Sequence, residues 1–190
     1  PEYQRDNAEH LRLLYAMKEW YRKSKLCGGI CFDIASICNR EERYTEALAV
    51  LREGIKKYPQ YEAVNALRNL EKEILQPHFN MNNLDDEFYP GDTVGLQINY
   101  RNLNKFTVRL RRVKCSLDTL YKYRGNAQRL RKFSKYYSER EFHLLSNKDY
   151  QPCDTVIQMP VPKAAGVYLI EAIAGGGGSN LSMFYVSPYK

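Results

Sequence analysis

Five cysteines are the side chains in this sequence best suited to metal binding or nucleophilic chemistry. Cys27 and Cys31 stand four residues apart and so share one face of a helix, but no Cys-x-x-Cys or His-x3-His pair completes a zinc site. Cys31 and Cys38 fall where a helix core is expected, so we interpret them as small buried hydrophobic residues. The odd count argues against a closed disulfide framework, and a bridge between Cys115 and Cys153 is left open. We expect no bound metal.

The remaining candidates for acid–base or cation chemistry are scattered. His10, His78 and His143 lie far apart in the sequence and are interpreted as ordinary surface or packing residues. The carboxylates at 85–87 could bind a hard cation, but the run lacks the spaced oxygens and the glycine of a calcium loop. No serine elbow, zincin helix, dinucleotide fingerprint or Walker loop occurs. The sequence therefore predicts a protein that is not an enzyme and carries no cofactor.

A strongly basic segment covers residues 101–148, where 14 Lys or Arg face 3 Asp or Glu. Such a patch could attract phosphate backbones or acidic protein surfaces, and aromatic residues are interleaved with it. The simpler interpretation is a solvated strand face followed by a long basic loop, and no nucleic-acid motif accompanies the charge. Nucleic acid is thus an unlikely partner. The candidate interaction surface consists of Arg101, Arg109, Arg111, Arg112, Arg129, Arg131 and Lys132.

The composition is that of a folded globular chain. The 190 residues carry a formal net charge of +7, with 44% hydrophobic and 27% charged residues, which excludes a disordered chain. No apolar run approaches the roughly 20 residues that a membrane helix needs, and no secretory signal is visible. The sequence starts at Pro1 and stops directly after a strand-like run, so we expect a fragment of a longer protein.

Apolar residues recur with a helical period through residues 1–77, and four helices are expected there. Asp6 and Glu9 resemble a capping box that begins the first helix, whose apolar stripe would be Leu13, Leu14, Met17, Trp20 and Tyr21.

The later helices follow the same logic. A glycine break at 28–29 precedes the second helix, Thr45 is placed to cap the third, and Pro59 ends it. A fourth helix is expected from about residue 61 to Leu75, before Pro77 stops it. The short breaks between the helices imply antiparallel hairpins.

The second and third helices also fit a 34-residue tetratricopeptide register counted from Gly28. Ala47 and Pro59 match that pattern outright, although a generic helical hairpin could match it as well. One repeat cannot bury its own apolar stripe, so the neighbouring helices must complete the stack. The register falls on Cys31, Ile34, Ala35, Cys38, Ala47, Leu51 and Pro59.

After Pro77 the apolar period changes to two, which indicates strands. The turn at residues 90–92 opens the first of them, and the glycine tract at 175–178 is interpreted as a flexible hairpin tip and not as a phosphate cradle, since no helix follows it. Residues 115–135 are expected to form a long, partly helical excursion. Residues 78–190 thus predict an antiparallel β-sandwich of immunoglobulin or fibronectin type, and the whole chain an α+β, multi-domain fold. The expected strands span residues 93–100, 106–110, 137–144, 155–161, 167–174 and 181–186.

Two strand motifs resemble a known family. Phe88-Tyr89-Pro90-Gly91-Asp92-Thr93-Val94 is similar to the Tyr-x-Pro-Gly-Asp/Glu-x-Val entry of macroglobulin domains, and the segment 165–172, with Gly166 and Tyr168, is similar to their Gly-x-Tyr strand. The helical stretch 39–77 that runs into this unit resembles the N-terminal region of bacterial alpha-2-macroglobulin-like proteins of the Bacteroides group. That resemblance implies a large periplasmic or cell-envelope-associated protein that traps proteases. The family's thioester motif, Cys-x-Glu-Gln, follows none of the five cysteines, so no functional residue is carried over.

The leading expectation is therefore a non-catalytic structural and interaction module without thioester or bait region. Its partners would be neighbouring macroglobulin domains of the same chain and, through the full-length protein, proteases. The alternative is a peptide- or protein-binding adaptor that uses the groove of the helical repeat, near Asn39, Asn65 and Arg68.

Overall fold

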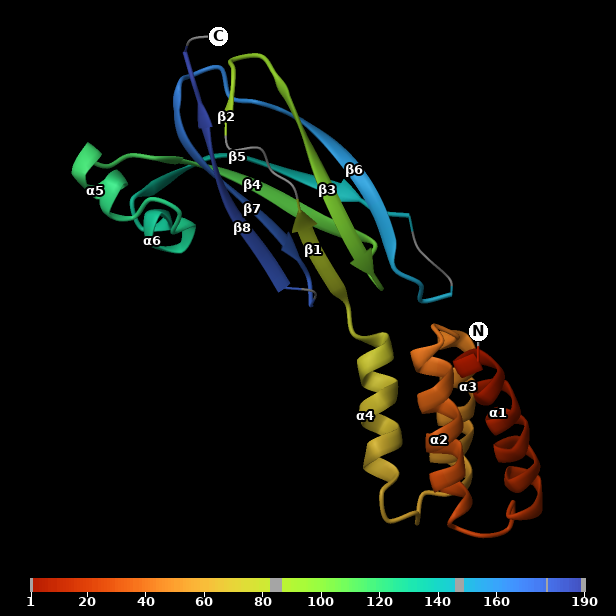
Figure 1. The fold of residues 1–190 in the computed structure, drawn as a ribbon. Coiled ribbons are helices and arrows are strands. Elements are labelled where there is room, and N and C mark those ends of the chain that lie inside the picture. The colour runs from red at the N-terminus through yellow and green to blue at the C-terminus, as the bar shows by residue number, and fades with distance from the viewer. Residues whose placement is uncertain (1, 83–86, 146–148, 177, 189–190) are drawn as a thin grey trace. The chain divides into compact units, whose positions relative to one another are not determined.

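The computed structural model describes residues 2–82, 87–145, 149–176 and 178–188 (Figure 1). The chain divides into two compact units. One holds residues 1–76 with 148–151, and the other holds residues 77–147 with 152–190. The first unit is helical and the second is built of strands, so the change of apolar period near residue 77 corresponds to a change of secondary structure. The described residues contain no helix long and apolar enough to cross a membrane.

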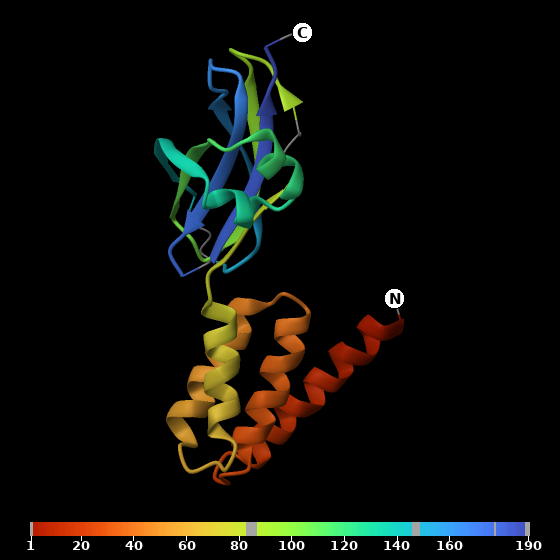
Figure 2. The same ribbon diagram turned by 90° about the vertical axis from the view of Figure 1, so that its left-hand side faces the viewer.

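The helical unit consists of four helices that form successive hairpins (Figure 2). The apolar face of α2 forms the centre of its core, where Cys31, Ile34, Ala35 and Cys38 are fully buried. This confirms the expectation that Cys31 and Cys38 act as core residues. The helices are α1 (Glu2–Trp20), α2 (Cys27–Arg40), α3 (Tyr44–Lys57) and α4 (Val64–Leu75).

Three of the expected helix starts are wrong. Asp6 lies inside α1, which begins at Glu2, because the residues before it are good helix formers and extend the helix backwards. The glycines at 28–29 lie in the first turn of α2, and the break falls before them. Thr45 lies in the first turn of α3, where Arg43 occupies the N-cap position.

The first helix buries only Leu14 of the stripe that was expected. Leu11 and Leu14 are buried, whereas Leu13 and Trp20 are 53% and 79% exposed. Met17 and Tyr21 of the expected stripe are exposed as well. The side of α1 that packs on α2 also carries Tyr15, which donates a hydrogen bond to Glu46 of α3, and the exposed apolar residues lie away from these contacts.

Glycine in α3 lets three helices approach closely. A Cβ atom at Gly54 would lie 2.6 Å from Cδ2 of Leu67 in α4 and 2.9 Å from Cβ of Cys31 in α2. The first contact is with the end of a flexible side chain, but the second is with an atom held by the α2 backbone. A side chain at this position would therefore push α2 and α3 apart.

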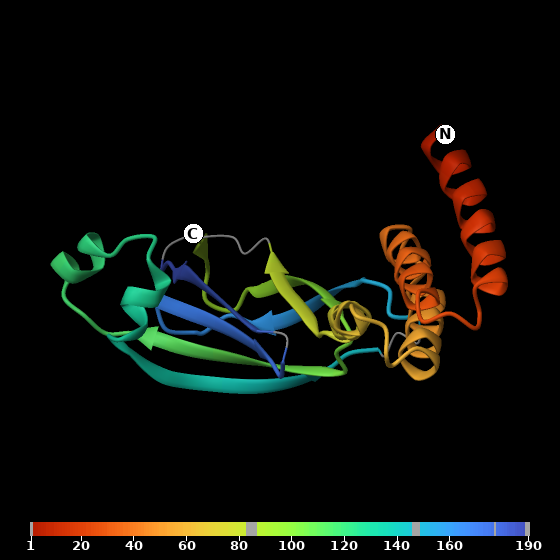
Figure 3. The same ribbon diagram turned by 90° about the horizontal axis from the view of Figure 1, so that it is seen from below.

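The strand unit consists of two sheets that enclose one core (Figure 3). The three-stranded sheet has the order β1-β3-β6, and the five-stranded sheet has the order β2-β8-β7-β4-β5. The alternating residues Val94, Leu96, Ile98 and Tyr100 of β3 are buried in this core, as their spacing predicted. The strands are β1 (His78–Asn82), β2 (Glu87–Phe88), β3 (Thr93–Arg101), β4 (Lys105–Val113), β5 (Ser134–His143), β6 (Cys153–Pro160), β7 (Gly166–Ala174) and β8 (Gly178–Val186).

The expectation of a purely antiparallel sandwich is wrong at one edge. Glu87 and Phe88 of β2 run parallel to Tyr185 and Val186 of β8. The two-residue β2 stands directly before the turn at residues 90–92, which leads from the five-stranded sheet to β3 in the other sheet. The direction of β2 is therefore set by this crossing and not by a hairpin. Neither β1 nor β2 was expected from the sequence.

The turns follow the predicted chemistry more closely. Gly91 has a φ of 92°, and the Asp92 side chain accepts a hydrogen bond of 2.9 Å from the backbone N–H of Tyr89. The Pro-Gly-Asp motif thus closes the turn that starts β3. The glycine tract joins β7 to β8 as a hairpin, and Gly177 within it lies outside the described residues.

We predict that Gly54→Ala lowers the stability of the helical unit. In an uncrowded helix this change stabilises by about 1 kcal/mol, so crowding must outweigh that gain and leave a net loss of about 1 kcal/mol. Urea unfolding followed by circular dichroism at 222 nm measures the change. Gly29→Ala is the control, because its Cβ would meet only the hydroxyl end of Tyr61, at 3.0 Å. A rise in the urea midpoint of Gly54→Ala would contradict the prediction.

Candidate functional site

Two short helices fold over the outer face of the five-stranded sheet, between β4 and β5 (Figure 2). They are α5 (Leu117–Lys122) and α6 (Ala127–Arg131), and each begins at a polar cap. The Ser116 hydroxyl accepts a hydrogen bond from the N–H of Thr119, and the Asn126 side chain accepts one from the N–H of Arg129. This excursion is partly helical, as the sequence predicted.

A buried carboxylate holds the excursion on the sheet. Glu171 of β7 is only 6% exposed, and its Oε1 lies 2.7 Å from a guanidinium nitrogen of Arg131 in α6. Arg109 of β4 lies 3.8 Å from the other carboxylate oxygen and also pairs with Glu139, at 2.7 Å. Leu130, beside Arg131, is fully buried. Apolar burial and an ion pair thus fix α6 to the sheet together.

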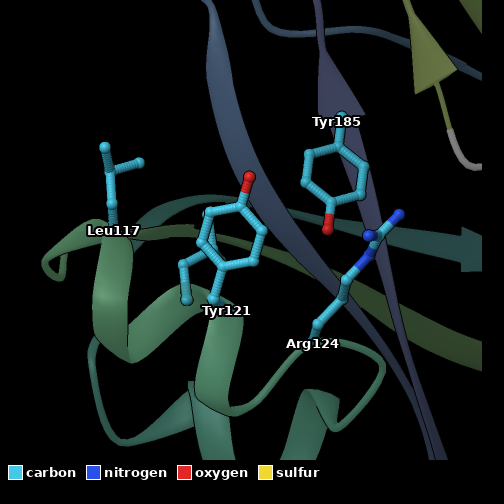
Figure 4. Close-up of a pocket in the computed structure, with 5 residues that line it drawn as sticks. Leu117, Tyr121, Arg124 and Tyr185 are labelled. Carbon is cyan, nitrogen blue, oxygen red and sulfur yellow. The ribbon is translucent and has the colours of Figure 1, made fainter.

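A groove lies between α5 and β8, which we call the α5–β8 groove (Figure 4). It encloses a cavity of about 250 Å³ lined by Leu117, Leu120, Tyr121, Arg124 and Tyr185. In Figure 4 Leu117, Tyr121 and Arg124 extend from α5 and the turn after it, and Tyr185 approaches from β8. The walls of the groove are therefore aromatic and aliphatic, with one cation among them.

A second hollow of about 520 Å³ adjoins the groove and shares Leu120, Arg124 and Tyr185 with it. It continues along the end of β8 to Ser187 and is also lined by Glu87. Arg124 thus lies where the two hollows meet. Together they form an elongated depression on the outer side of the strand unit.

The structure separates the seven predicted interaction residues. Arg109 and Arg131 come together at Glu171. Arg111 donates a hydrogen bond to the Ser134 hydroxyl, and Arg112 donates one to the carbonyl of Ala165 and lies over the Tyr168 ring. The remaining three are placed apart: Arg101 ends β3 in the other sheet, whereas Arg129 and Lys132 are exposed in and beside α6.

Leu117, Leu120, Tyr121, Arg124 and Tyr185 are site residues that the sequence did not predict. The sequence does contain one indication of α5 and its exposed face: Ser116 is a good helix cap, and Leu117 and Tyr121 follow it four residues apart. No pattern in the sequence, however, relates α5 to Tyr185.

The residues considered for catalysis or metal binding stay apart. Within residues 2–82, 87–145, 149–176 and 178–188, no three His, Cys, Asp or Glu side chains lie close enough to hold a metal ion. His10, His78 and His143 are all exposed. The run at 85–87 lies outside the described residues except for Glu87, which lines the second hollow.

The cysteines are all free thiols. The bridge between Cys115 and Cys153, which the sequence leaves open, is not formed, since both are free thiols in this structure. In the helical unit, burial raises the pKa of Cys31 to about 12 and that of Cys38 to about 11. These thiols are therefore poor nucleophiles at neutral pH.

Comparisons with known proteins found no family model and no curated protein that matches this chain. Among solved structures, native alpha-2-macroglobulin from Escherichia coli spanning domains NIE-MG1 is 21% identical, with a TM-score of 0.39 over 60% of this chain and 61% of that one. A fragment of that protein spanning MG0-NIE-MG1 is 22% identical, with a TM-score of 0.38 over 59% of this chain and 39% of that one. Spo0M, the sporulation control protein from Bacillus subtilis, is 11% identical, with a TM-score of 0.34 over 60% of this chain and 50% of that one. This chain thus spans less than two thirds of the length of these structures.

We predict that native protein at pH 8 reacts rapidly with iodoacetamide at no more than two thiols. Cys27, Cys31 and Cys38 are fully buried, whereas Cys115 and Cys153 are partly accessible. Mass spectrometry counts the labels, and the same protein in guanidinium chloride serves as the control that takes up five. Rapid labelling of Cys31 or Cys38 in the native protein would contradict the assigned burial.

We also predict that Glu171→Gln destabilises the strand unit by about 2 kcal/mol, because the buried carboxylate that pairs with Arg131 and lies near Arg109 is replaced by a neutral amide. Hydrogen exchange in residues 117–131 should accelerate with it, since Arg131 loses its anchor. Urea unfolding followed by tyrosine fluorescence, together with exchange mass spectrometry, measures both effects. Glu139→Gln, which removes an exposed partner of Arg109, should cost less than about 1 kcal/mol. Equal effects of the two substitutions would refute the anchoring role.

Proposed function

We propose that this chain is a non-catalytic structural and interaction module of a large macroglobulin-type protein. The observation that carries the proposal is the α5–β8 groove, an apolar depression with one cation that is held on a rigid sheet. Among the residues that the structure describes, its lining contains no thiol, histidine or serine nucleophile next to a base. Such a surface is suited to holding a partner and not to transforming it.

Two features of the described residues support the finer assignment to a helical repeat followed by a first macroglobulin domain. Ala35 and Ala47, at the small-residue positions of the tetratricopeptide register, are fully buried, and this suits close helix packing. The Pro-Gly-Asp motif has a clear physical role, since Asp92 closes the turn before β3. We propose that the sandwich is of immunoglobulin or fibronectin type and that the protein is of the Bacteroides group.

The remaining parts of the proposal concern its surroundings. The partners would be neighbouring macroglobulin domains of the same chain and, through the full-length protein, proteases. The location would be the periplasm or the cell envelope. The adaptor alternative places binding on the helical unit, where Leu13 and Trp20 of α1 are exposed and the exposed side chains of Asn65 and Arg68 of α4 form a hydrogen bond of 3.1 Å.

The proposal predicts that the isolated 190-residue chain neither inhibits a protease nor forms a covalent adduct with one. No cysteine stands in a thioester motif, so no acyl group is available for capture. Incubation with trypsin and a chromogenic substrate, followed by denaturing electrophoresis, tests both statements, and serum alpha-2-macroglobulin is the positive control. Slower substrate turnover in the presence of the chain, or an electrophoretic band of a covalent adduct that forms only with the folded chain, would count against the proposal.

A further inference from the structure

The α5–β8 groove leaves apolar side chains open to solvent. Leu117 and Tyr121 are 74% and 73% exposed. They stand four residues apart in α5, so they lie on one face of that helix, and both line the same cavity. Most surface apolar residues occur singly, and two that line one hollow with Tyr185 form a contact site for an apolar side chain.

The charge of the excursion determines which partner suits it. Residues 114–135 contain seven Lys or Arg and one Asp. Arg131 is neutralised by Glu171, but Arg124 has no ion pair with any residue that the structure describes. Its side chain is exposed and lines both hollows, so it is accessible for a charge-assisted hydrogen bond with an anionic partner. The complement of this site is therefore a carboxylate.

The shape of the depression favours an extended segment. The 250 Å³ cavity accommodates one or two side chains, and the second hollow continues from Arg124 along β8 to Ser187. Because α6 is anchored through Glu171, the excursion offers this surface in a preorganised form. A peptide in extended conformation presents alternate side chains at a spacing that such a groove can accept.

We propose that the α5–β8 groove binds an extended, acidic protein segment in which a carboxylate side chain stands beside an aliphatic or aromatic one. The carboxylate binds the Arg124 guanidinium, and the apolar side chain packs between Leu117, Tyr121 and Tyr185. A protein segment is favoured over nucleic acid because the aliphatic side chains of Leu117 and Leu120 form part of the lining and complement an apolar side chain better than a base. The inference goes beyond the macroglobulin-type assignment and stands without it.

The test uses the full chain and a fluorescein-labelled octapeptide, Gly-Ser-Glu-Leu-Tyr-Glu-Ser-Gly, in a fluorescence anisotropy titration. We expect a Kd of about 10–100 µM, which is typical of a short peptide on a small groove. Replacing both peptide glutamates by glutamine should weaken binding roughly tenfold, and Arg124→Gln in the protein should have the same effect. Leu117→Ser should weaken binding by a similar factor, because the apolar contact is lost.

Lys122→Gln is the matched control. It also removes one positive charge, two residues before Arg124, but Lys122 lies over the Tyr123 ring and is not among the residues that line the groove, so binding should change less than twofold. Equal losses in Lys122→Gln and Arg124→Gln would overturn the proposal, as would no saturation at about 1 mM peptide. Tighter binding of an eight-nucleotide single-stranded DNA that Arg124→Gln leaves unchanged would also overturn it. A blue shift of Trp20 emission on peptide binding would place the contact on the helical unit and refute the groove proposal. Failure of the peptide experiment would not change the result expected in the protease experiment.

Discussion

A carboxylate that is almost wholly removed from water needs cationic partners, and the arrangement of the sandwich surface follows from this requirement at Glu171. Its partners come from different parts of the chain, Arg109 from β4 and Arg131 from α6. The ion pair therefore joins the helical excursion to the sheet that the excursion interrupts. With Leu130 buried beside it, α6 is held down, and α5 is placed where its exposed side chains face β8.

In the helical unit the corresponding constraint is space. Gly54, Ala35, Ala47 and the buried thiols are small side chains at helix contacts, and they let backbones approach more closely than larger residues would. Burial of Cys31 in that core also raises its pKa to about 12, so the tight packing removes its nucleophilic character. The cysteines that attract attention as chemical groups are thus packing residues.

The strands could be predicted because each faces the core with every second residue, a local property that β3 shows from Val94 to Tyr100. The two missed strands have no such pattern: β2 has two residues, and its parallel pairing with β8 depends on a crossing between sheets. The expected helix starts at Asp6 and Thr45 are wrong because a residue that can cap a helix does not by itself start one: good helix formers precede Asp6, and Arg43 holds the N-cap position before Thr45. The α1 stripe was misjudged because periodicity shows which residues share a face, but not how much of that face finds a neighbour.

The basic segment, residues 101–148, shows most clearly which properties the sequence determines and which depend on the tertiary structure. Its charge, its caps at Ser116 and Asn126 and its partly helical character are local properties, and the order of residues is enough to establish them. Which of its cations form ion pairs cannot be derived from the local sequence. Arg131 pairs with Glu171, forty residues away in the chain, whereas Arg124 lines the groove beside apolar residues. Charge is a property of the residue, but neutralisation and burial are properties of its neighbours, and only the folded sheet brings those neighbours together.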